Sequence, residues 1–369
     1  MNLGPYFSSL QGGDYHVFPD GRVLMSGAHV LSDTERGFEG LYSLIWFSNE
    51  GYLDTTRTHR YCDNVIYQFE QQPDGKFLCS GTMNSFEGQP VTRVFRVMPD
   101  GALDPSFQAE LQSWGEARSY FTLEDGRILV GGWLKLNGSE TIRSLIRLHA
   151  DGSLDETYHL LDIIAEFDPD SPIPSVAGIY RLDDGRFIIT GRFDHVDGQV
   201  RGGIAMLDAD GNLLDDAFTG SGCGVYEYVV PSGSSLYKSL AGIVPAPDGG
   251  YYIYGAYHGY DDGTINDPEQ RFVSRLYGLN VGVREEVALA QLSVFPNPSD
   301  GHFEVRASLP LRNANLALVA LTGKTLRTWA WPQGAQQAGF DASGLAAGNY
   351  ILRLASEERS FHLPLNLTP

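Results

Sequence analysis

The sequence of 369 residues predicts an all-β protein, built from a repeated β-sheet module and followed by a smaller β domain. Three observations predict this class. A short Asp-Gly turn recurs through the first 280 residues at intervals of 54, 51, 59 and 64 residues. Apolar runs of strand length flank each turn, and no long stretch has helical periodicity. The composition then changes near residue 292, where the second domain begins.

Each repeat begins with the Asp-Gly turn. In the third copy, Asp125-Gly126 is followed by the apolar run Ile128–Val130 and then by Gly132, six residues after the turn glycine. The same spacing holds in all five copies, with the glycine pairs Gly21 and Gly27, Gly75 and Gly81, Gly126 and Gly132, Gly185 and Gly191, and Gly249 and Gly255. Glycine accepts positive φ and aspartate bonds to its local backbone, so each turn predicts a β-hairpin.

The apolar run after each turn predicts a strand that is buried on both faces. The runs are too short for helices and rich in β-branched or aromatic residues: Val23–Met25, Phe77–Cys79, Ile128–Val130, Phe187–Ile189 and Tyr251–Ile253. The closing glycine predicts a bend or a close backbone approach at the strand end.

The second half of each repeat holds another strand and a further turn. These turns lie at Gly51, Gly101, Gly152 and Gly211, and short Leu-Asp segments follow them: Leu53-Asp54, Leu103–Phe107, Leu154–Tyr158 and Leu214–Phe218. Four short antiparallel strands in a unit of this length are typical of a propeller blade. The fifth repeat loses its second turn at residues 277–280.

The repeats resemble the delta-60 repeat family, a β-propeller of unknown function. The resemblance rests chiefly on Glu124–Gly132 with Arg147–Asp155, and on Arg96–Phe107. It implies a five-repeat β-propeller over residues 1–280. Residues 3–7 align with Leu103–Phe107, so we expect them to complete the fifth blade and close the ring. The alternative is that the chain is a fragment of a larger propeller.

Residues 281–291 interrupt the repeat and are expected to form a linker. Short alternating apolar segments over residues 292–369 then predict a small Ig-like β-sandwich. Three motifs stand out in this region: Phe295-Pro296-Asn297-Pro298, the turn Thr322-Gly323-Lys324, and Leu345–Tyr350 with its Gly348.

In this order the motifs resemble the C-terminal sorting domain of type IX secretion cargo in Bacteroidetes. The resemblance implies that residues 292–369 interact with the type IX secretion machinery. It also implies a secreted or outer-membrane-surface location. Residues 1–30 show no signal peptide, so we expect one upstream of Met1 in the natural protein.

Composition narrows the possible functions. The formal net charge is −20, with −21 on residues 1–290 and +1 on residues 291–369, which argues against nucleic acid as a partner. No window holds eighteen consecutive apolar residues, so no membrane-spanning helix is expected. The three cysteines make no disulfide framework: Cys79 is expected in the core, and Cys62 and Cys223 as unpaired small residues.

The sequence predicts no catalytic residues, no metal site and no cofactor. The nine histidines form no His-x-His or His-Glu-x-x-His arrangement. Residues 220–224 lack the spacing of a nucleophile elbow, and a loop is the better interpretation. Residues 208–212 place their glycine two positions too early for an EF-hand loop, so a turn is expected there.

The loops after the closing glycines carry the candidate ligand-binding residues. These loops vary most between repeats, and in a propeller they gather on one face. Together they offer polar and aromatic side chains that could bind a glycan or a protein: Trp133, Asn137, Asp194, His195, Asp197, Tyr257 and His258. Two alternatives stay open, namely a purely structural surface module and a propeller enzyme, such as a polysaccharide lyase or hydrolase.

Overall fold

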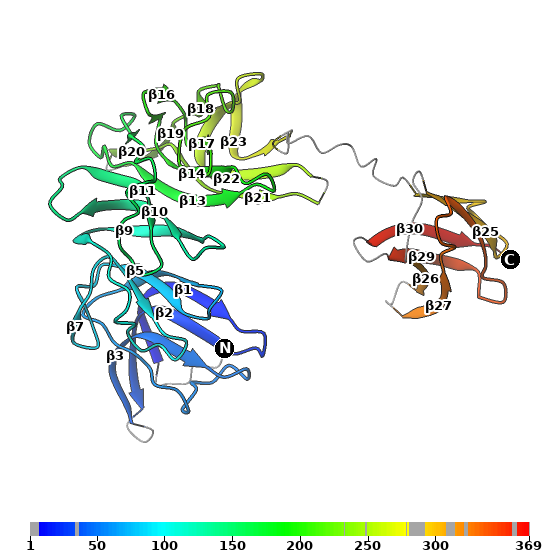
Figure 1. The fold of residues 1–369 in the computed structure, drawn as a ribbon, viewed down its shortest axis with the longest axis horizontal. Helices are drawn as coiled ribbons and strands as arrows, with labels where there is room; N and C mark the ends of the chain where they lie inside the picture. Colours follow the sequence, from blue (N-terminus) through cyan, green and yellow to red (C-terminus); the bar gives the residue numbers. More distant parts are fainter. Residues whose placement is uncertain are drawn as a thin grey trace. The chain divides into compact units, whose positions relative to one another are not determined.

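The computed structural model describes residues 7–33, 37–231, 233–247, 249–277, 279, 292–307, 314–320, 324–355 and 360–368. The chain divides into two compact units, Met1–Asn280 and Val281–Pro369 (Figure 1). The regular elements of the described residues are all β-strands, which confirms the all-β class. None of these residues forms a helix that is long and apolar enough to cross a membrane. The expected linker, residues 281–291, lies outside the described residues.

Unit 1 contains five main sheets in chain order, each an antiparallel meander. Sheet 1 is formed by β1 (Phe7–Val17), β2 (Val23–Asp33) and β3 (Phe38–Phe47). Sheet 2 is formed by β4 (Ile66–Gln71), β5 (Phe77–Gly81) and β8 (Val94–Val97). Sheet 3 is formed by β9 (Leu111–Thr122), β10 (Ile128–Leu136) and β11 (Ile142–Leu148). In each sheet the strand that follows the Asp-Gly turn lies in the middle.

Sheets 4 and 5 repeat this arrangement. Sheet 4 is formed by β13 (Ser175–Arg181), β14 (Phe187–Arg192) and β17 (Ile204–Leu207). Sheet 5 is formed by β21 (Ser239–Pro245), β22 (Tyr251–Asp261) and β23 (Asn266–Leu276), and β18 (Gly222–Cys223) pairs with the far end of β22. The Gly-rich segment that we expected to be a loop therefore contains this short strand.

Smaller hairpins project from the loops between the main strands. They comprise β6 (Ser85–Phe86) with β7 (Gln89–Pro90), β15 (His195–Val196) with β16 (Gln199–Val200) and β12 (Ile163–Ile164), and β19 (Tyr226–Val230) with β20 (Gly233–Tyr237).

The Asp-Gly turns form the hairpins that the sequence predicts. In the third copy, Gly126 N–H donates to the Leu123 carbonyl at 2.9 Å, and Leu123 N–H donates to the Arg127 carbonyl at 2.7 Å. Gly126 has φ +85°, and the Asp125 carboxylate accepts the Arg127 N–H at 3.1 Å. This is a three-residue loop that ends in a left-handed glycine, which requires glycine at that position.

In the first four repeats the predicted fourth strand is reduced to a single antiparallel bridge. The bridges pair Phe47 with Leu53, Val97 with Leu103, Leu148 with Leu154, and Leu207 with Leu213. In the fourth repeat the bridging residue is thus Leu213, and the alignment that placed Leu214-Asp215 there was wrong by one residue. Leu214 instead occupies the position of Asp155. The Leu214 N–H donates to the Met206 carbonyl at 2.9 Å, and in the third repeat the Asp155 N–H donates to the Arg147 carbonyl in the same way.

The five sheets stack in chain order, from the blue strands of sheet 1 to the yellow strands of sheet 5 (Figure 1). A buried apolar cluster fills each of the four interfaces between consecutive sheets. No strand of sheet 1 packs extensively on sheet 5 within the described residues. Phe7 pairs with Leu31 inside sheet 1, so its predicted place in the fifth blade was wrong. Residues 3–6 lie outside the described residues.

Cys79 lies in this core as expected, and Cys62 and Cys223, which were expected only to be unpaired, lie in it as well. Cys62, Cys79 and Cys223 are buried and unpaired. Burial raises the pKa of all three thiols, to about 12 for Cys223.

Unit 2 is a sandwich of two antiparallel sheets. One contains β24 (Leu292–Phe295), β25 (His302–Ala307) and β28 (Gln337–Asp341). The other contains β27 (Thr325–Ala330), β26 (Asn315–Ala320), β29 (Gly348–Ala355) and β30 (Ser360–Leu367). Side chains from both sheets form one apolar core. Thr322 and Gly323 of the predicted hairpin turn lie outside the described residues.

Candidate functional site

The loop carboxylates of the fourth repeat shape the backbone around them. Asp194 is buried, and its Oδ2 accepts the N–H groups of Glu166 and Phe167 at 3.0 and 2.9 Å. Its Oδ1 lies 2.9 Å from Nδ1 of His195. Two candidate residues are therefore in contact, and Asp194 uses both oxygens to fix the loop rather than to face solvent.

Asp197 has a similar role at the tip of the β15–β16 hairpin. Its φ is +47° and that of Gly198 is +75°, as a tight two-residue hairpin turn requires. Asp197 Oδ1 accepts the N–H of Asp162 at 2.7 Å, and its Oδ2 lies 2.8 Å from Nε2 of His159. In the second repeat, Glu87 takes the same place with φ +51°. The hairpin tips are thus held rigidly by carboxylate-to-backbone bonds.

The two candidates on sheet 5 differ in exposure. Tyr257 is fully buried, and its hydroxyl shares a 2.6 Å hydrogen bond with Ser274 Oγ. Burial raises its pKa to about 12. In this position Tyr257 belongs to the core rather than to an exposed loop surface. His258 is half-buried.

The remaining two candidates lie on β10 and directly after it. Trp133 is half-buried, and the Arg118 guanidinium lies 4.8 Å from the centre of its indole ring. Lys135, two residues on, stacks in the same way on Trp114 at 4.8 Å. Both cation–π pairs join β9 to β10, the middle strand of sheet 3. Asn137 is exposed at the tip of the following turn.

Asn137 also lines a cleft of about 830 Å³ between repeats two and three. The walls come from β7, the start of β8 and the segment between them, from the Leu-Asp segment with the chain that follows it (residues 103–110), and from Asp151 and Ser153. The lining mixes apolar side chains such as Val91 and Leu103 with hydroxyl, amide and carboxylate groups. The sequence did not reveal this cleft, because its walls lie far apart in the chain.

A buried ion-pair network anchors one wall of this cleft, at Asp104. Arg96 Nε donates to Asp104 Oδ2 at 2.8 Å, and Lys76 Nζ lies 3.0 Å from the same oxygen. Ser106 Oγ donates to Asp104 Oδ1 at 2.6 Å. Burial alone would raise the pKa of Asp104, but these bonds outweigh it and lower that pKa below the ordinary range. The pair therefore stabilises the fold at neutral and mildly acidic pH, and weakens only as the pH falls through the lowered pKa.

The same network recurs one repeat later and joins neighbouring sheets. Arg147 bonds to Asp155 at 2.7 Å, and Arg127 lies 3.2 Å from the same oxygen. Each buried arginine also donates to a carbonyl in the next repeat: Arg96 to Ala150 O at 2.7 Å, and Arg147 to Ala209 O at 2.9 Å. The arginine thus clamps one sheet to the next.

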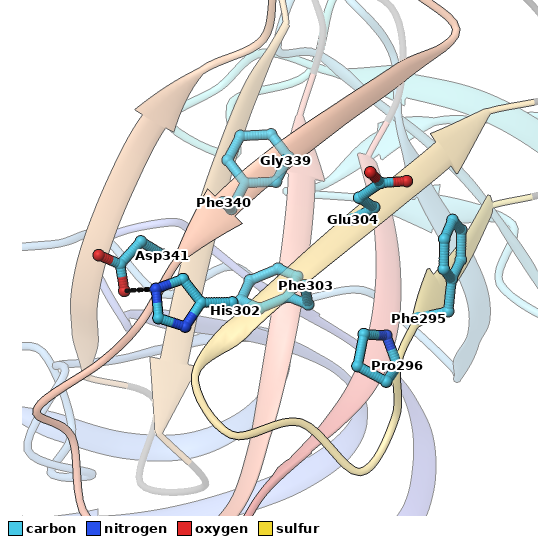
Figure 2. Close-up of a pocket in the computed structure, with 8 residues that line it drawn as sticks. All are labelled: Phe295, Pro296, His302, Phe303, Glu304, Gly339, Phe340 and Asp341. Atoms are coloured by element: carbon cyan, nitrogen blue, oxygen red, sulfur yellow. Dashed lines mark ion pairs between the residues drawn. The ribbon is translucent and has the colours of Figure 1, made fainter.

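A second pocket, of about 540 Å³, lies in unit 2 (Figure 2). It is lined by Phe295, Pro296, His302, Phe303, Glu304, Gly339, Phe340 and Asp341. His302 and Asp341 lie at one end, with Nε2 and Oδ1 3.8 Å apart, and Glu304 lies apart from them (Figure 2). The first two residues of the Phe-Pro-Asn-Pro motif therefore line a pocket with apolar and ionisable walls.

The other motif residues of unit 2 hold its strands together. Asn297 Nδ2 donates to Pro364 O at 2.9 Å, and Asn297 Oδ1 accepts the N–H of Asn366 at 2.9 Å, which ties the motif to β30. Tyr350 donates its hydroxyl to Ala346 O, four residues upstream, at 2.7 Å. A tyrosine that bonds to upstream backbone fixes a corner in many β-sandwiches.

No three His, Cys, Asp or Glu side chains gather as a possible metal-ligand set within the described ranges. The Asp208 carboxylate, in the turn compared with a calcium loop, instead accepts the N–H groups of Asp210 and Asn212 at 2.9 and 2.8 Å.

Comparison with known proteins identifies both units. Residues 72–107, 123–158 and 182–213 match the family described as a domain of unknown function (DUF5122) beta-propeller. Residues 293–362 match the secretion system C-terminal sorting domain. No curated protein matches the chain significantly.

Solved structures show only distant likeness. An extracellular domain of a one component system from B. thetaiotaomicron is 10% identical with a TM-score of 0.24, and the match covers 97% of this chain and 56% of that one. A biofilm associated protein BSP domain is 10% identical with a TM-score of 0.19, over 100% of this chain and 68% of that one. This chain therefore spans about half the length of the first of these structures.

The family matches agree with the repeats, the sandwich and the motifs described above. The chain combines DUF5122 β-propeller repeats with a secretion system C-terminal sorting domain, and it is therefore a secreted or cell-surface protein.

Proposed function

We propose that this protein is a non-catalytic surface or secreted binding protein. Unit 1 binds an extracellular glycan or protein ligand, and unit 2 directs export through the type IX secretion machinery. The observation that carries the binding role is the cleft between repeats two and three, about 830 Å³ in volume. Its size lies in the range of ligand sites, and its lining combines apolar contact with hydrogen-bonding groups.

The rigidity of the cleft supports binding. The Leu-Asp segment of its wall is anchored by the Arg96–Asp104 pair, and the Asp104 N–H donates to Arg96 O at 2.8 Å. A wall that is already fixed loses little conformational entropy when a ligand binds.

The use of the loop carboxylates favours binding over catalysis. Asp194 and Asp197 accept backbone N–H groups that shape their own loops. A general acid–base pair needs carboxylates that face the substrate at a defined separation.

The test is a glycan array and a peptide array probed with the purified chain. A ligand found in this way is then measured against two variants. Asn137→Trp fills the mouth of the cleft and should abolish binding. Asn84→Trp, on the equivalent exposed loop of the second repeat and outside the cleft, should bind like the wild type.

Two results would contradict the proposal. Release of soluble products from a polysaccharide by the purified chain would establish an enzyme. Equal binding by the Asn137→Trp variant would place the ligand elsewhere on the molecule.

A further inference from the structure

Sheet 5 exposes apolar side chains at positions that are buried in every other sheet. The pairing registers make Tyr252 equivalent to four residues at the second position of the run after the turn: Leu24, Leu78, Leu129 and Ile188. These four are at most 1% exposed, and each packs in the interface with the following sheet. Tyr252 is 37% exposed. The expectation that its run would be buried on both faces was therefore wrong.

A second position on β23 shows the same pattern. Val273 pairs with Tyr254, and its equivalents in the other sheets are Leu44, Val94, Leu145 and Ile204. Those residues are at most 2% exposed, whereas Val273 is 48% exposed. Val244, Tyr254 and Tyr277 are exposed as well. We define the front face of sheet 5 as Val244, Tyr252, Tyr254, Val273 and Tyr277.

Sheet 1 exposes the β1 side of the complementary surface, while Ile45 and Phe47 on β3 are buried within the chain. Tyr15 pairs with Met25, and its equivalents in sheets 2, 3 and 5 are Phe69, Tyr120 and Ile243. Those residues are at most 8% exposed and pack against the preceding sheet, whereas Tyr15 is 68% exposed. We define the back face of sheet 1 as the exposed Tyr15 and Val17 together with Val23 and Met25, which are half-buried against Ile45 and Phe47 of β3.

The two faces are the two halves of an interface that unit 1 already forms four times. Each interior interface joins the front of one sheet to the back of the next through an apolar cluster. Exposed apolar patches of this kind mark interaction surfaces. Within the described residues, sheet 1 and sheet 5 of the same chain do not pack extensively on one another.

We propose that the front face of sheet 5 binds the back face of sheet 1 of a second copy of this chain. The contact is heterologous, because a different surface is used on each copy. It continues the stack of sheets from one molecule into the next and removes both apolar faces from water.

The position of Arg275 supports an assembly in which the front face of sheet 5 contacts the next copy. It occupies the position of the clamping residues Arg96 and Arg147, which donate to a carbonyl of the following sheet. In sheet 5 the Arg275 guanidinium lies 5.4 Å from the ring centre of Tyr252 and 4.9 Å from that of Tyr277. In the assembly it would reach the second turn of the incoming sheet, around Asn49.

The test measures the mass of residues 1–369 over a wide concentration range by analytical ultracentrifugation. The wild type should associate as its concentration rises. Tyr252→Glu in the front face and Tyr15→Lys in the back face should each weaken this association roughly tenfold or more. Tyr61→Lys changes a tyrosine that is 48% exposed outside both faces, and it should associate like the wild type.

Mixing the two defective variants gives the decisive measurement. The Tyr15→Lys chain keeps an intact front face, and the Tyr252→Glu chain keeps an intact back face. An equimolar mixture should form a dimer of one chain of each kind that grows no further. Thermal unfolding of each variant shows that the variants are folded.

Three results would overturn the proposal. A wild type that stays monomeric while both substitutions lower its melting temperature would mean that the two faces close a ring within one chain. A monomeric wild type with unchanged melting temperatures in the variants would leave the faces to another partner. A mixture without a heterodimer would exclude head-to-tail contact.

Discussion

At the residue scale, the buried aspartates of repeats two and three are each held by two cations and a hydroxyl. The fourth repeat lacks this buried ion pair, since Met206 and Leu214 take the places of Arg147 and Asp155. In the fourth repeat both members of the pair are replaced, whereas the first repeat keeps the aspartate, Asp54, and has Trp46 in place of the arginine. An arginine alone would leave a buried charge without its partner.

Removing one residue of the Arg147–Asp155 ion pair should therefore lower the free energy of unfolding more than replacing both residues. We expect Asp155→Ala to lower the free energy of unfolding by roughly 3–5 kcal/mol, because Arg147 stays buried without its carboxylate. The double variant Arg147→Met, Asp155→Leu copies the fourth repeat and should recover most of that loss. Denaturant unfolding measures both, with exposed Asp216→Ala as the control. A double variant less stable than Asp155→Ala would refute the equivalence of the two arrangements.

His59 makes stability depend on pH. It is buried, and its Nδ1 accepts the N–H of Trp46 at 3.1 Å, which requires an unprotonated Nδ1. Burial lowers its pKa to about 4, against 6.5 for an ordinary histidine. The unfolded chain therefore takes up a proton below about pH 6.5, while the folded chain takes it up only near pH 4.

Stability should consequently fall as the pH drops through that window, by roughly 2–3 kcal/mol from this residue. Urea unfolding at pH 7 and at pH 4.5 measures the difference, and His59→Gln should reduce it. His149→Gln, at an exposed position, serves as the control. An unchanged pH dependence in His59→Gln would show that other groups cause it.

At the element scale, the closing glycine of each repeat permits a bulge in the preceding strand. A Cβ at Gly81, Gly132, Gly191 or Gly255 would meet the carbonyl oxygen of Val65, Glu116, Ser175 or Ser239, respectively. The register shifts at these same places, as between Gly131 and Gly132. The expected close backbone approach is thus confirmed, and the neighbour is a main-chain atom that cannot rotate away.

Gly132→Val should destabilise unit 1 by at least roughly 1–3 kcal/mol, because strand β9 must shift to make room. Gly12→Ala is the matched control, since a Cβ there has no neighbour within 4 Å. Differential scanning calorimetry compares the two. Equal melting temperatures for Gly132→Val and the wild type would show that the strand yields without cost.

At the scale of the whole molecule, the chain is two units with separate cores. The core of unit 2 is formed by its own two sheets, and the Asn297 bonds to β30 join the beginning of this unit to its end. A unit that closes on itself in this way can act as a separate signal.

Residues 281–369, fused behind a signal peptide and a reporter protein, should export the reporter from a type IX-competent host. Cleavage is expected within residues 281–291 and should leave unit 1 folded. Reporter detected outside the cell or on its surface checks the prediction, and the host's own cargo serves as the control. Reporter retained in the periplasm while that cargo is still exported would contradict it.

The sequence by itself determined the local structure. Glycine at positions of positive φ, aspartate beside it and apolar runs of strand length act within a few residues, so the Asp-Gly turns, the strands that flank them and the close backbone approach at the closing glycines were predictable. The Phe-Pro-Asn-Pro and Leu-x-x-Gly-x-Tyr motifs identified the sorting domain in the same way, because their residues lie close together in the chain.

Only the tertiary structure decided which of these residues face one another. Asp194, Asp197 and Tyr257 looked like ligand-binding groups, yet they bond to Glu166, Asp162 and Ser274, partners 17 to 35 residues away. The cleft beside Asn137 and the exposure of Tyr252 could not be predicted from the sequence either, since the sequence pattern of a repeat is the same whether or not another sheet covers it. Burial depends on the neighbour in space, and the local pattern carries no information about that neighbour.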